Sequence, residues 1–220
     1  MTPSKEDYLK TIVELGGETR VINNKELVQA LNVSAASVTD MNAKLLKENL
    51  ITHVPYRGVQ VTQKGLRTAN QLIRKHRLWE VFLSEKLGYD WNEVHEDADR
   101  LEHASSDLLI KRLNEFLGEP THDPHGGLIP NEDGTTAQTN FLPLVELFPN
   151  DSFLLKEVED QKEFLSYLSS KGIHLGAFYQ VKEMDPYEGP ITLENEKGEH
   201  ITLGYQAARN IYVDKVAEKQ

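Results

Sequence analysis

The side chains most capable of chemistry are histidines and carboxylates spaced at helical intervals between residues 76 and 103. His76 and Glu80 are four residues apart, so they share one face of a helix. A stripe of imidazoles and carboxylates beside apolar faces needs a cation to offset its desolvation and like-charge repulsion. The spacing therefore predicts a divalent metal site. Four further members fall at intervals of four, three and one residues, which predicts a single helical stripe of His95, Asp99, Glu102 and His103.

The chemistry of these ligands limits the metal. The chain has no cysteine, so thiolate ligands and disulfides are impossible. Imidazole nitrogen with carboxylate oxygen fits Mn²⁺, Fe²⁺ or Zn²⁺. A second group, HDPH at 122–125, contains His125 but is also typical of an ordinary turn. For the helical stripe, a solvated acidic face with incidental histidines is the competing interpretation.

The N-terminal segment has the pattern of a helix-turn-helix followed by a hairpin. Helices are expected over about 4–15, 24–32 and 34–49, and strands over 50–54 and 59–62. Two short helices, the second with a small polar outer face and followed directly by a two-stranded wing, predict DNA binding. A three-helix domain with a hairpin and no DNA role is the alternative.

Specific residues of this segment are expected to face DNA. The third helix turns its small polar side outward, and Arg57 lies near the tip of the wing. Lys44, Lys47 and Arg57 would reach phosphates, although ordinary solvated lysines are an equal alternative for the first two. The residues expected to face base edges and methyl groups are Ser34, Ala36, Ser37, Thr39 and Asp40.

The remainder of the chain predicts helices and then short strands. Amphipathic helices are expected over about 64–87 and 92–117, with more apolar surface than one small domain consumes, so a symmetric dimer is predicted. Residues 118–148 are rich in Gly and Pro and are typical of a linker. Short strands after residue 151, around a helix over 161–170, predict a small β-barrel. The expected fold class is α+β.

Charge is distributed unevenly along the chain. The net charge of −11 argues against a general nucleic-acid binder. Residues 1–75, however, carry eleven Lys and Arg against seven Asp and Glu, a net of +4 that leaves −15 for the rest. This asymmetry is compatible with DNA contact by the N-terminal part alone. Neither a signal peptide nor an apolar stretch of membrane length is evident, so we expect a cytoplasmic protein without a membrane partner.

These motifs resemble the diphtheria toxin repressor family, also called the manganese transport regulator family. The likeness covers all 220 residues and rests on the winged helix, on RKHRLWE, and on the pattern V-H-x-x-A-x-x-x-E-H-x-x-S-D. It implies a homodimeric, metal-dependent repressor that binds operator DNA of metal-uptake genes. The implied domains are a winged helix-turn-helix at 1–63, an all-helical dimerisation and metal-binding domain with linker at 64–140, and an SH3-like (FeoA-like) barrel at 141–220.

The resemblance also implies the ligands of two metal sites. Iron-type members have a cysteine or methionine among the ligands where this chain has Asp7 and Asp99, which favours Mn²⁺ over Fe²⁺. Zn²⁺ is a further option for the second site. The implied primary ligands are Asp7, His76, Asp99, Glu102 and His103. The implied second set is Glu80, Asp123, His125 and Asp160, with His95 as a weaker candidate.

Two positions depart from the family pattern. Some manganese-type members have a second carboxylate one turn after Asp7, where this chain has Lys10, which weakens the case for a binuclear primary cluster. Asp123 stands where related barrel-containing regulators often have a cysteine, a change expected to alter selectivity at the second site.

A switch follows from the implied primary site. Asp7 lies in the DNA-binding segment, whereas Glu102 and His103 lie in the dimerisation segment, so a shared metal would tie the two segments into one geometry. Two other function classes compete with this repressor. A metal hydrolase is disfavoured because no nucleophile elbow or phosphate loop is evident. A metal-storage protein with a purely structural helix-turn-helix is the second, and an iron-responsive regulator is the runner-up within the same fold.

Overall fold

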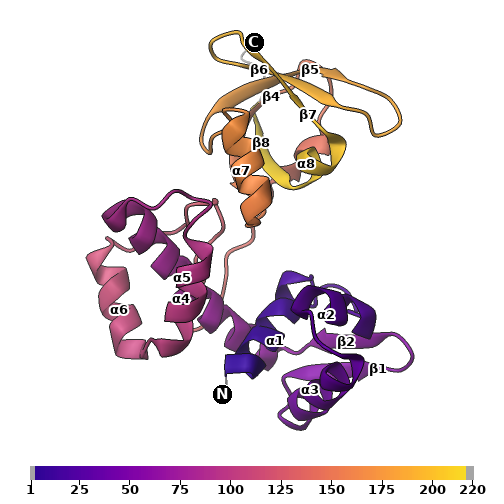
Figure 1. Cartoon of the computed structure of the whole chain (residues 1–220), viewed down its shortest axis with the longest axis vertical. Coiled ribbons are helices and arrows are strands. Elements are labelled where there is room, and N and C mark those ends of the chain that lie inside the picture. Colours follow the sequence, from indigo (N-terminus) through magenta and orange to yellow (C-terminus); the bar gives the residue numbers. More distant parts are fainter. Residues whose placement is uncertain (1–2, 217–220) are drawn as a thin grey trace. The chain divides into compact units, whose positions relative to one another are not determined.

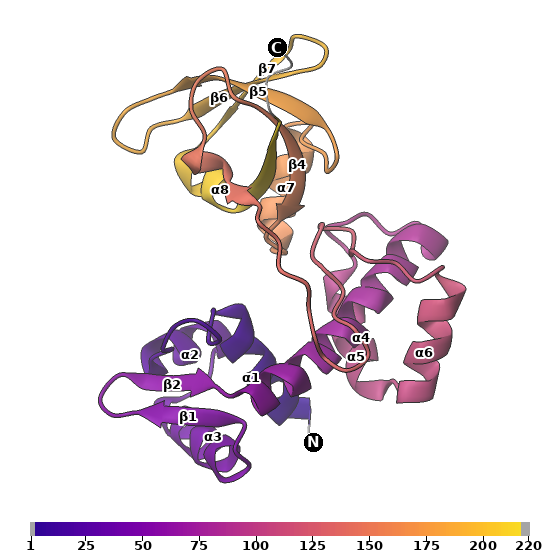
Figure 2. The same cartoon turned by 180° about the vertical axis from the view of Figure 1, so that it is seen from behind.

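The computed structural model describes residues 3–216 (Figures 1 and 2). The chain forms two compact units. The first consists of Met1–Trp79, Asp99–Phe116 and Ile129–Ala137, and the second of Glu80–Ala98, Leu117–Leu128 and Gln138–Gln220. None of the helices in the described part of the chain combines the length and apolar character needed to span a bilayer.

The first unit begins with the expected three helices, α1 (Pro3–Glu14), α2 (Asn24–Leu31) and α3 (Ala35–Lys47). Asn23 caps α2 in a reciprocal capping box with Glu26. Ser34 caps α3 by accepting a hydrogen bond from the Ser37 backbone N–H at 3.1 Å. The helices enclose a core whose members are less than 5% exposed: Tyr8, Leu9, Ile12, Leu27, Val38 and Leu45.

The predicted wing is present as two antiparallel strands, β1 (Ile51–Val54) and β2 (Gly58–Val61). Their turn places Tyr56 and Arg57 in solvent. Beyond the wing, the Thr62 hydroxyl caps helix α4 (Gln63–Leu87) by accepting from the Gly65 N–H at 3.0 Å. The winged helix-turn-helix expected from the sequence is therefore confirmed.

One predicted helix is wrong in its continuity. The helix expected over about 92–117 is two helices, α5 (His95–Ala104) and α6 (Asp107–Phe116). Between them the Ser105 hydroxyl donates to the Leu101 carbonyl at 2.6 Å, and the Ser106 hydroxyl accepts from the Leu109 N–H at 3.2 Å. Serine hydroxyls that bond to nearby backbone compete with helix continuation and restart it as an N-cap.

The second unit contains the strand-rich C-terminal region expected from the sequence. Its six strands are antiparallel neighbours in the order β3-β8-β4-β5-β6-β7. Irregularities in pairing at Leu155/Glu157 and Val181/Glu183 help the sheet curl around its core (Figure 1). The elements are β3 (Leu142–Pro143), a 3₁₀ turn (Leu144–Glu146), β4 (Ser152–Val158), α7 (Lys162–Ser170), β5 (Phe178–Met184), β6 (Ile191–Asn195), β7 (His200–Leu203), α8 (Tyr205–Arg209) and β8 (Ile211–Val216).

The close approach of α4 to the wing gives a prediction for stability. Gly65 is buried, and a Cβ there would lie 1.9 Å from the Leu50 carbonyl oxygen. We expect Gly65→Ala to destabilise the protein by about 1–3 kcal/mol because backbone must move to relieve the clash. Gly204→Ala is the control, since a Cβ at Gly204 meets no atom within 4 Å. Urea unfolding of the two variants measures the difference, and equal midpoints would contradict the packing argument.

Candidate metal centres and DNA-binding face

The first candidate centre joins α1 to α5 within the first unit. Asp7 comes from α1, and Glu102 and His103 come from α5; their ligand atoms lie within 4.8 Å of one another. His103 Nε2 is 2.6 Å from Asp7 Oδ1 and 3.4 Å from Glu102 Oε1. Two atoms on one ion are at most about 4.4 Å apart, twice a metal–ligand distance of about 2.2 Å. Both measured pairs fit a single divalent ion.

An unsatisfied oxygen marks this centre as a place for a cation. Glu102 is 1% exposed, and its Oε1 is buried with no hydrogen-bond partner among residues 3–216. Leaving a buried carboxylate oxygen without a donor is costly. Burial also raises the pKa of Asp7, an effect that the nearby His103 only partly opposes. A divalent cation between Asp7, Glu102 and His103 would relieve both costs.

Beside this centre, the Lys10 ammonium lies among three further side chains with ligand atoms. Lys10 Nζ is 3.0 Å from Glu102 Oε2, 3.2 Å from Asp99 Oδ1 and 3.2 Å from His76 Nδ1. His76, Asp99 and Glu102 by themselves could hold a metal. Burial alone would lower the pKa of Lys10, but the Glu102 and Asp99 carboxylates outweigh it and raise that pKa. The lysine therefore supplies a fixed positive charge to this group.

Glu6 was not predicted as a site residue from the sequence, and it contacts the second ring nitrogen of His103. Its Oε2 is 2.9 Å from His103 Nδ1, while Asp7 is on the Nε2 side. Burial lowers the pKa of His103, but the hydrogen bond to Glu6 and the charges of Asp7 and Glu102 raise it overall. A sequence feature that could have indicated Glu6 is its position directly before Asp7, which was a predicted metal ligand.

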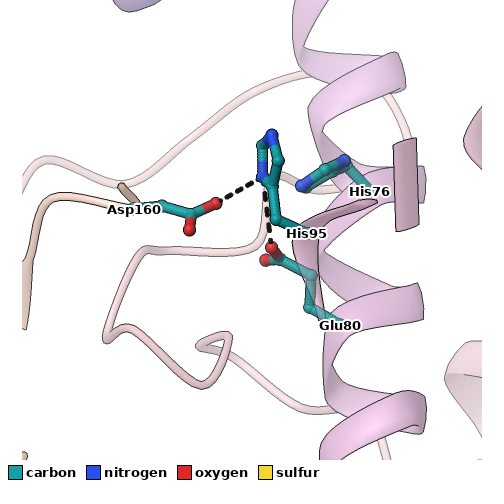
Figure 3. A group of neighbouring side chains, drawn as sticks. All are labelled: His76, Glu80, His95 and Asp160. Atoms are coloured by element: carbon teal, nitrogen blue, oxygen red, sulfur yellow. Dashed lines mark hydrogen bonds and ion pairs between the residues drawn. The ribbon is translucent and has the colours of Figure 1, made fainter. Parts of the chain in front are cut away.

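The second candidate centre lies in the second unit. Figure 3 shows His95 between two carboxylates, with dashed lines to Asp160 and Glu80; His76, one turn before Glu80 on α4, is also drawn. His95 Nδ1 is 2.7 Å from Asp160 Oδ2 and 3.9 Å from Glu80 Oε1. Asp160 follows strand β4 of the barrel and His95 opens α5.

A second group around Glu80 involves the HDPH turn. Glu80, Asp123 and His125 have ligand atoms within 4.8 Å of one another and are predominantly buried. His125 Nε2 is 2.7 Å from the Trp91 carbonyl oxygen and must donate to it. Its Nδ1 is thereby left as the basic nitrogen, and within the described chain this buried atom has no hydrogen-bond partner. It faces Glu80 Oε2 at 3.8 Å.

The structure divides the single helical stripe expected from the sequence. His95 contacts Asp160 and lies near Glu80, whereas Asp99, Glu102 and His103 face the group around Lys10 and Asp7. Part of the reason is that α5 is only ten residues long, so its two ends reach different neighbours. His95, the weaker of the implied second-site candidates, lies as close to Glu80 and Asp160 as the geometry of one ion requires.

The residues expected to face DNA lie on an exposed surface of α3 and the wing. All eight are solvent-exposed: Ser34, Ala36, Ser37, Thr39, Asp40, Lys44, Lys47 and Arg57. Some of them also make contacts within the helix. Thr39 Oγ1 donates to the Ala35 carbonyl at 2.9 Å, and Lys44 pairs with Asp40 at 2.7 Å. These contacts order the side chains without burying them, and their role in DNA binding stays a prediction.

The environment of His103 predicts a measurable titration. A raised folded-state pKa means that the imidazolium adds stability to the metal-free protein, fully below about pH 6.5, and that this stability is lost as pH rises through the raised pKa. We expect Glu6→Gln to lower that pKa because the carboxylate charge is removed. NMR titration of the His103 ring in metal-free protein measures it. Glu18→Gln, at an exposed position of the same domain, is the control; an unchanged value in Glu6→Gln would refute the assignment.

Three successive segments of the chain match known protein domains. Residues 1–59 match the iron dependent repressor N-terminal DNA binding domain, residues 62–131 its metal binding and dimerisation domain, and residues 142–215 the FeoA domain. The diphtheria toxin repressor of Corynebacterium efficiens is 31% identical over 188 residues, which are 80% of this chain and 81% of that protein. The iron-dependent repressor IdeR of Mycobacterium leprae is 29% identical over 98% of this chain and 99% of its own length.

Solved structures agree over nearly the whole chain. A manganese-dependent transcriptional repressor in complex with manganese superposes with a TM-score of 0.88 at 33% identity, covering 96% of this chain and 99% of that one. ScaR with bound Zn²⁺ gives a TM-score of 0.86 at 39% identity with the same coverage. The chain therefore belongs to the diphtheria toxin repressor family of metal-dependent, DNA-binding transcriptional repressors with a C-terminal FeoA domain.

Proposed function

We propose that this protein is a homodimeric repressor that Mn²⁺ activates for binding to operator DNA of metal-uptake genes. The observation that carries the proposal is the centre formed by Asp7, Glu102 and His103. Asp7 lies on the first helix of the winged helix-turn-helix, and the other two lie on α5 of the helical domain. We retain the domain limits 1–63, 64–140 and 141–220 as part of this proposal.

The primary centre is proposed to hold one divalent ion. Asp7, Glu102 and His103 would be its ligands, with Asp99 and His76 beside them. The ion would supply a double positive charge to the orphaned Glu102 oxygen. Lys10 already supplies a positive charge to the other Glu102 oxygen at 3.0 Å. The ammonium therefore occupies the place that a second ion in this group would need.

The ligand set supports Mn²⁺ as the activating metal. Every candidate ligand is a carboxylate or an imidazole, and hard oxygen ligands suit Mn²⁺ better than they suit metals that prefer sulfur. The manganese named for one superposed repressor supports the same choice for this chain. Fe²⁺ is the second candidate, because the iron-dependent repressor IdeR of Mycobacterium leprae aligns over 98% of this chain.

Activation would act through geometry rather than through contact between metal and DNA. Asp7, Asp99 and Glu102 bring three carboxylates toward one region, and Lys10 offsets only part of their repulsion. A state in which α1 moves away from α5 therefore competes with the closed one. A cation that binds the closed state more tightly shifts the population toward it. The closed state would present α3 and the wing in the arrangement that fits two successive major grooves of a dimer site.

Exposed apolar residues on α6 support a homodimer. Leu108 and Phe116 are each 66% exposed, and Leu109 is 45% exposed. These side chains lie in the segment that matches the family's metal binding and dimerisation domain. A symmetric contact with a second copy would remove this apolar surface from water.

The switch is tested by gel shift with an operator fragment at fixed salt. We expect wild-type protein to gain DNA affinity on addition of Mn²⁺, by the 5- to 150-fold typical of allosteric coupling. Asp7→Ala should lose this gain because the link between α1 and α5 loses a ligand. Asp185→Ala, at an exposed position in the barrel, is the matched control and should behave as wild type. Equal retention of the operator fragment with and without Mn²⁺, in both wild type and Asp7→Ala, would refute the switch. Repeating the titration with Fe²⁺ and Zn²⁺ ranks the metals.

The wing is tested by the salt dependence of binding. If Arg57 neutralises a phosphate, Arg57→Ala weakens binding about equally for all sequences and lowers the slope of log K against log salt by about 1. Arg209→Ala, which removes an exposed arginine in the barrel domain, should leave the slope unchanged. A slope that is equal in Arg57→Ala and wild type would remove Arg57 from the interface.

A further inference from the structure

We propose that the second centre is built for two divalent cations that share Glu80, rather than for one. This inference rests on the proposed metal-binding function and concerns only the second unit. Five side chains take part, and they separate into one group around His95 and another around His125: Glu80, His95, Asp123, His125 and Asp160.

The first position lies on the His95 side of Glu80. His95 Nδ1 is 2.7 Å from Asp160 Oδ2 and 3.9 Å from Glu80 Oε1 (Figure 3). Both separations are below the limit of about 4.4 Å for two ligand atoms on one ion. The hydrogen bond between His95 and Asp160 holds the two groups in place before a cation binds.

The second position lies on the His125 side. His125 is 2% exposed, and its orphaned Nδ1 faces Glu80 Oε2 at 3.8 Å. The Trp91 carbonyl fixes the ring tautomer from the opposite edge, as outer partners of metal-binding histidines commonly do. Asp123 Oδ1 accepts from the N–H groups of His125 and Gly127 at 2.8 and 2.9 Å, which orients the Asp123 carboxylate in the same turn.

Glu80 connects the two positions. Its side chain is 1% exposed, and its two oxygens face different imidazoles, Oε1 toward His95 and Oε2 toward His125. Each of the two groups of ligand atoms contains Glu80 and only one of these histidines. In the described part of the chain, no group of ligand atoms within 4.8 Å of one another contains both histidines, so one ion placed between Glu80 and either histidine lies out of reach of the other. A carboxylate that binds one ion with each oxygen is a common bridge in two-metal sites.

The backbone around the HDPH turn makes this arrangement rigid. The Val158 N–H donates to the His125 carbonyl at 3.0 Å, which ties the turn to strand β4. Gly126 has a φ of +88°, and a Cβ there would lie 2.0 Å from the Lys156 carbonyl oxygen. Only glycine permits this close approach. The turn that carries Asp123 and His125 is thus held against the strand that leads to Asp160.

The proposal is tested by counting Mn²⁺ ions bound per subunit at saturation, by equilibrium dialysis of the full chain and metal analysis. We expect His95→Ala and His125→Ala each to bind one ion fewer than wild type. Glu80→Gln should bind two fewer. His122→Ala is the matched control, since His122 is an exposed histidine of the same turn, and it should keep the wild-type number. If a histidine variant fails to fold, Asp160→Asn replaces His95→Ala and Asp123→Asn replaces His125→Ala. Each is expected to bind one ion fewer than wild type.

Low-temperature electron paramagnetic resonance gives an independent readout. Two Mn²⁺ ions bridged by Glu80 should give a spin-coupled signal that disappears in either histidine variant, although each variant keeps one of the two ions. The double variant His95→Ala/His125→Ala should lose two ions. A wild-type count in His95→Ala, or loss of only one ion in the double variant, would overturn the inference. The gel shift separates the two proposals. If DNA binding depends on Mn²⁺ but the second centre holds a single ion, the proposed function stands and only the two-ion inference fails.

Discussion

The burial of Glu102 is the constraint on which the rest of the first unit depends. Its two carboxylate oxygens have unequal environments: Oε2 accepts a hydrogen bond from Lys10 and lies 2.6 Å from His76 Nδ1, whereas Oε1 has no donor within residues 3–216. A buried carboxylate that is only half satisfied destabilises the closed arrangement of α1 and α5. Lys10 offsets the charge of one oxygen without a metal, and in the proposed switch the other oxygen is left for the cation. A repressor that responds to metal requires both properties, because a fully satisfied centre would stay closed at every metal concentration.

The break between α5 and α6 helps determine where the candidate metal ligands of α5 lie. Ser105 accepts a hydrogen bond from the Trp79 indole at 2.8 Å and donates to the Leu101 carbonyl, so the end of α5 is fixed against α4. With its C-terminal end held, α5 directs Glu102 and His103 toward α1. His95, two turns earlier, belongs to the second unit. One short helix therefore carries candidate ligands of both centres. His95 at its start lies in the second centre, and Glu102 and His103 near its end lie in the first.

Much of the fold and part of the sites could be predicted from the sequence, for identifiable reasons. The helix-turn-helix and wing were predictable because caps such as Ser34 and Thr62 and the alternation of Val59 and Val61 act locally. The clustered imidazoles and carboxylates were predictable as candidate ligands because a histidine-rich helical pattern is unusual. The break between α5 and α6 at Ser105 was not predictable, because a pair of serines can either continue a helix or interrupt it. The 3₁₀ turn at Leu144–Glu146 and helix α8 were also missed, because both are shorter than a recognisable period.

Contacts between distant segments account for the remaining differences. Asp160 was reached only through resemblance to a family, because nothing in its own segment indicates a neighbour 65 residues away. The neighbours of Glu6 and Lys10 likewise depend on how α1 meets α5, which no local pattern encodes.

The two centres also differ in what a cation there could hold together. The first spans α1 and α5, so its occupancy bears on the position of the DNA-binding helices. The second joins Asp160, at the end of a barrel strand, to the HDPH turn and the start of α5, and Lys162 reinforces that junction by pairing with Glu96 at 2.9 Å. Asn92 and Trp91 add hydrogen bonds to Ser166 and Ser169 of α7. The barrel therefore contributes a candidate ligand and several polar contacts to a junction inside one unit. We infer that the second centre stabilises that unit, and that the switch itself resides at Glu102.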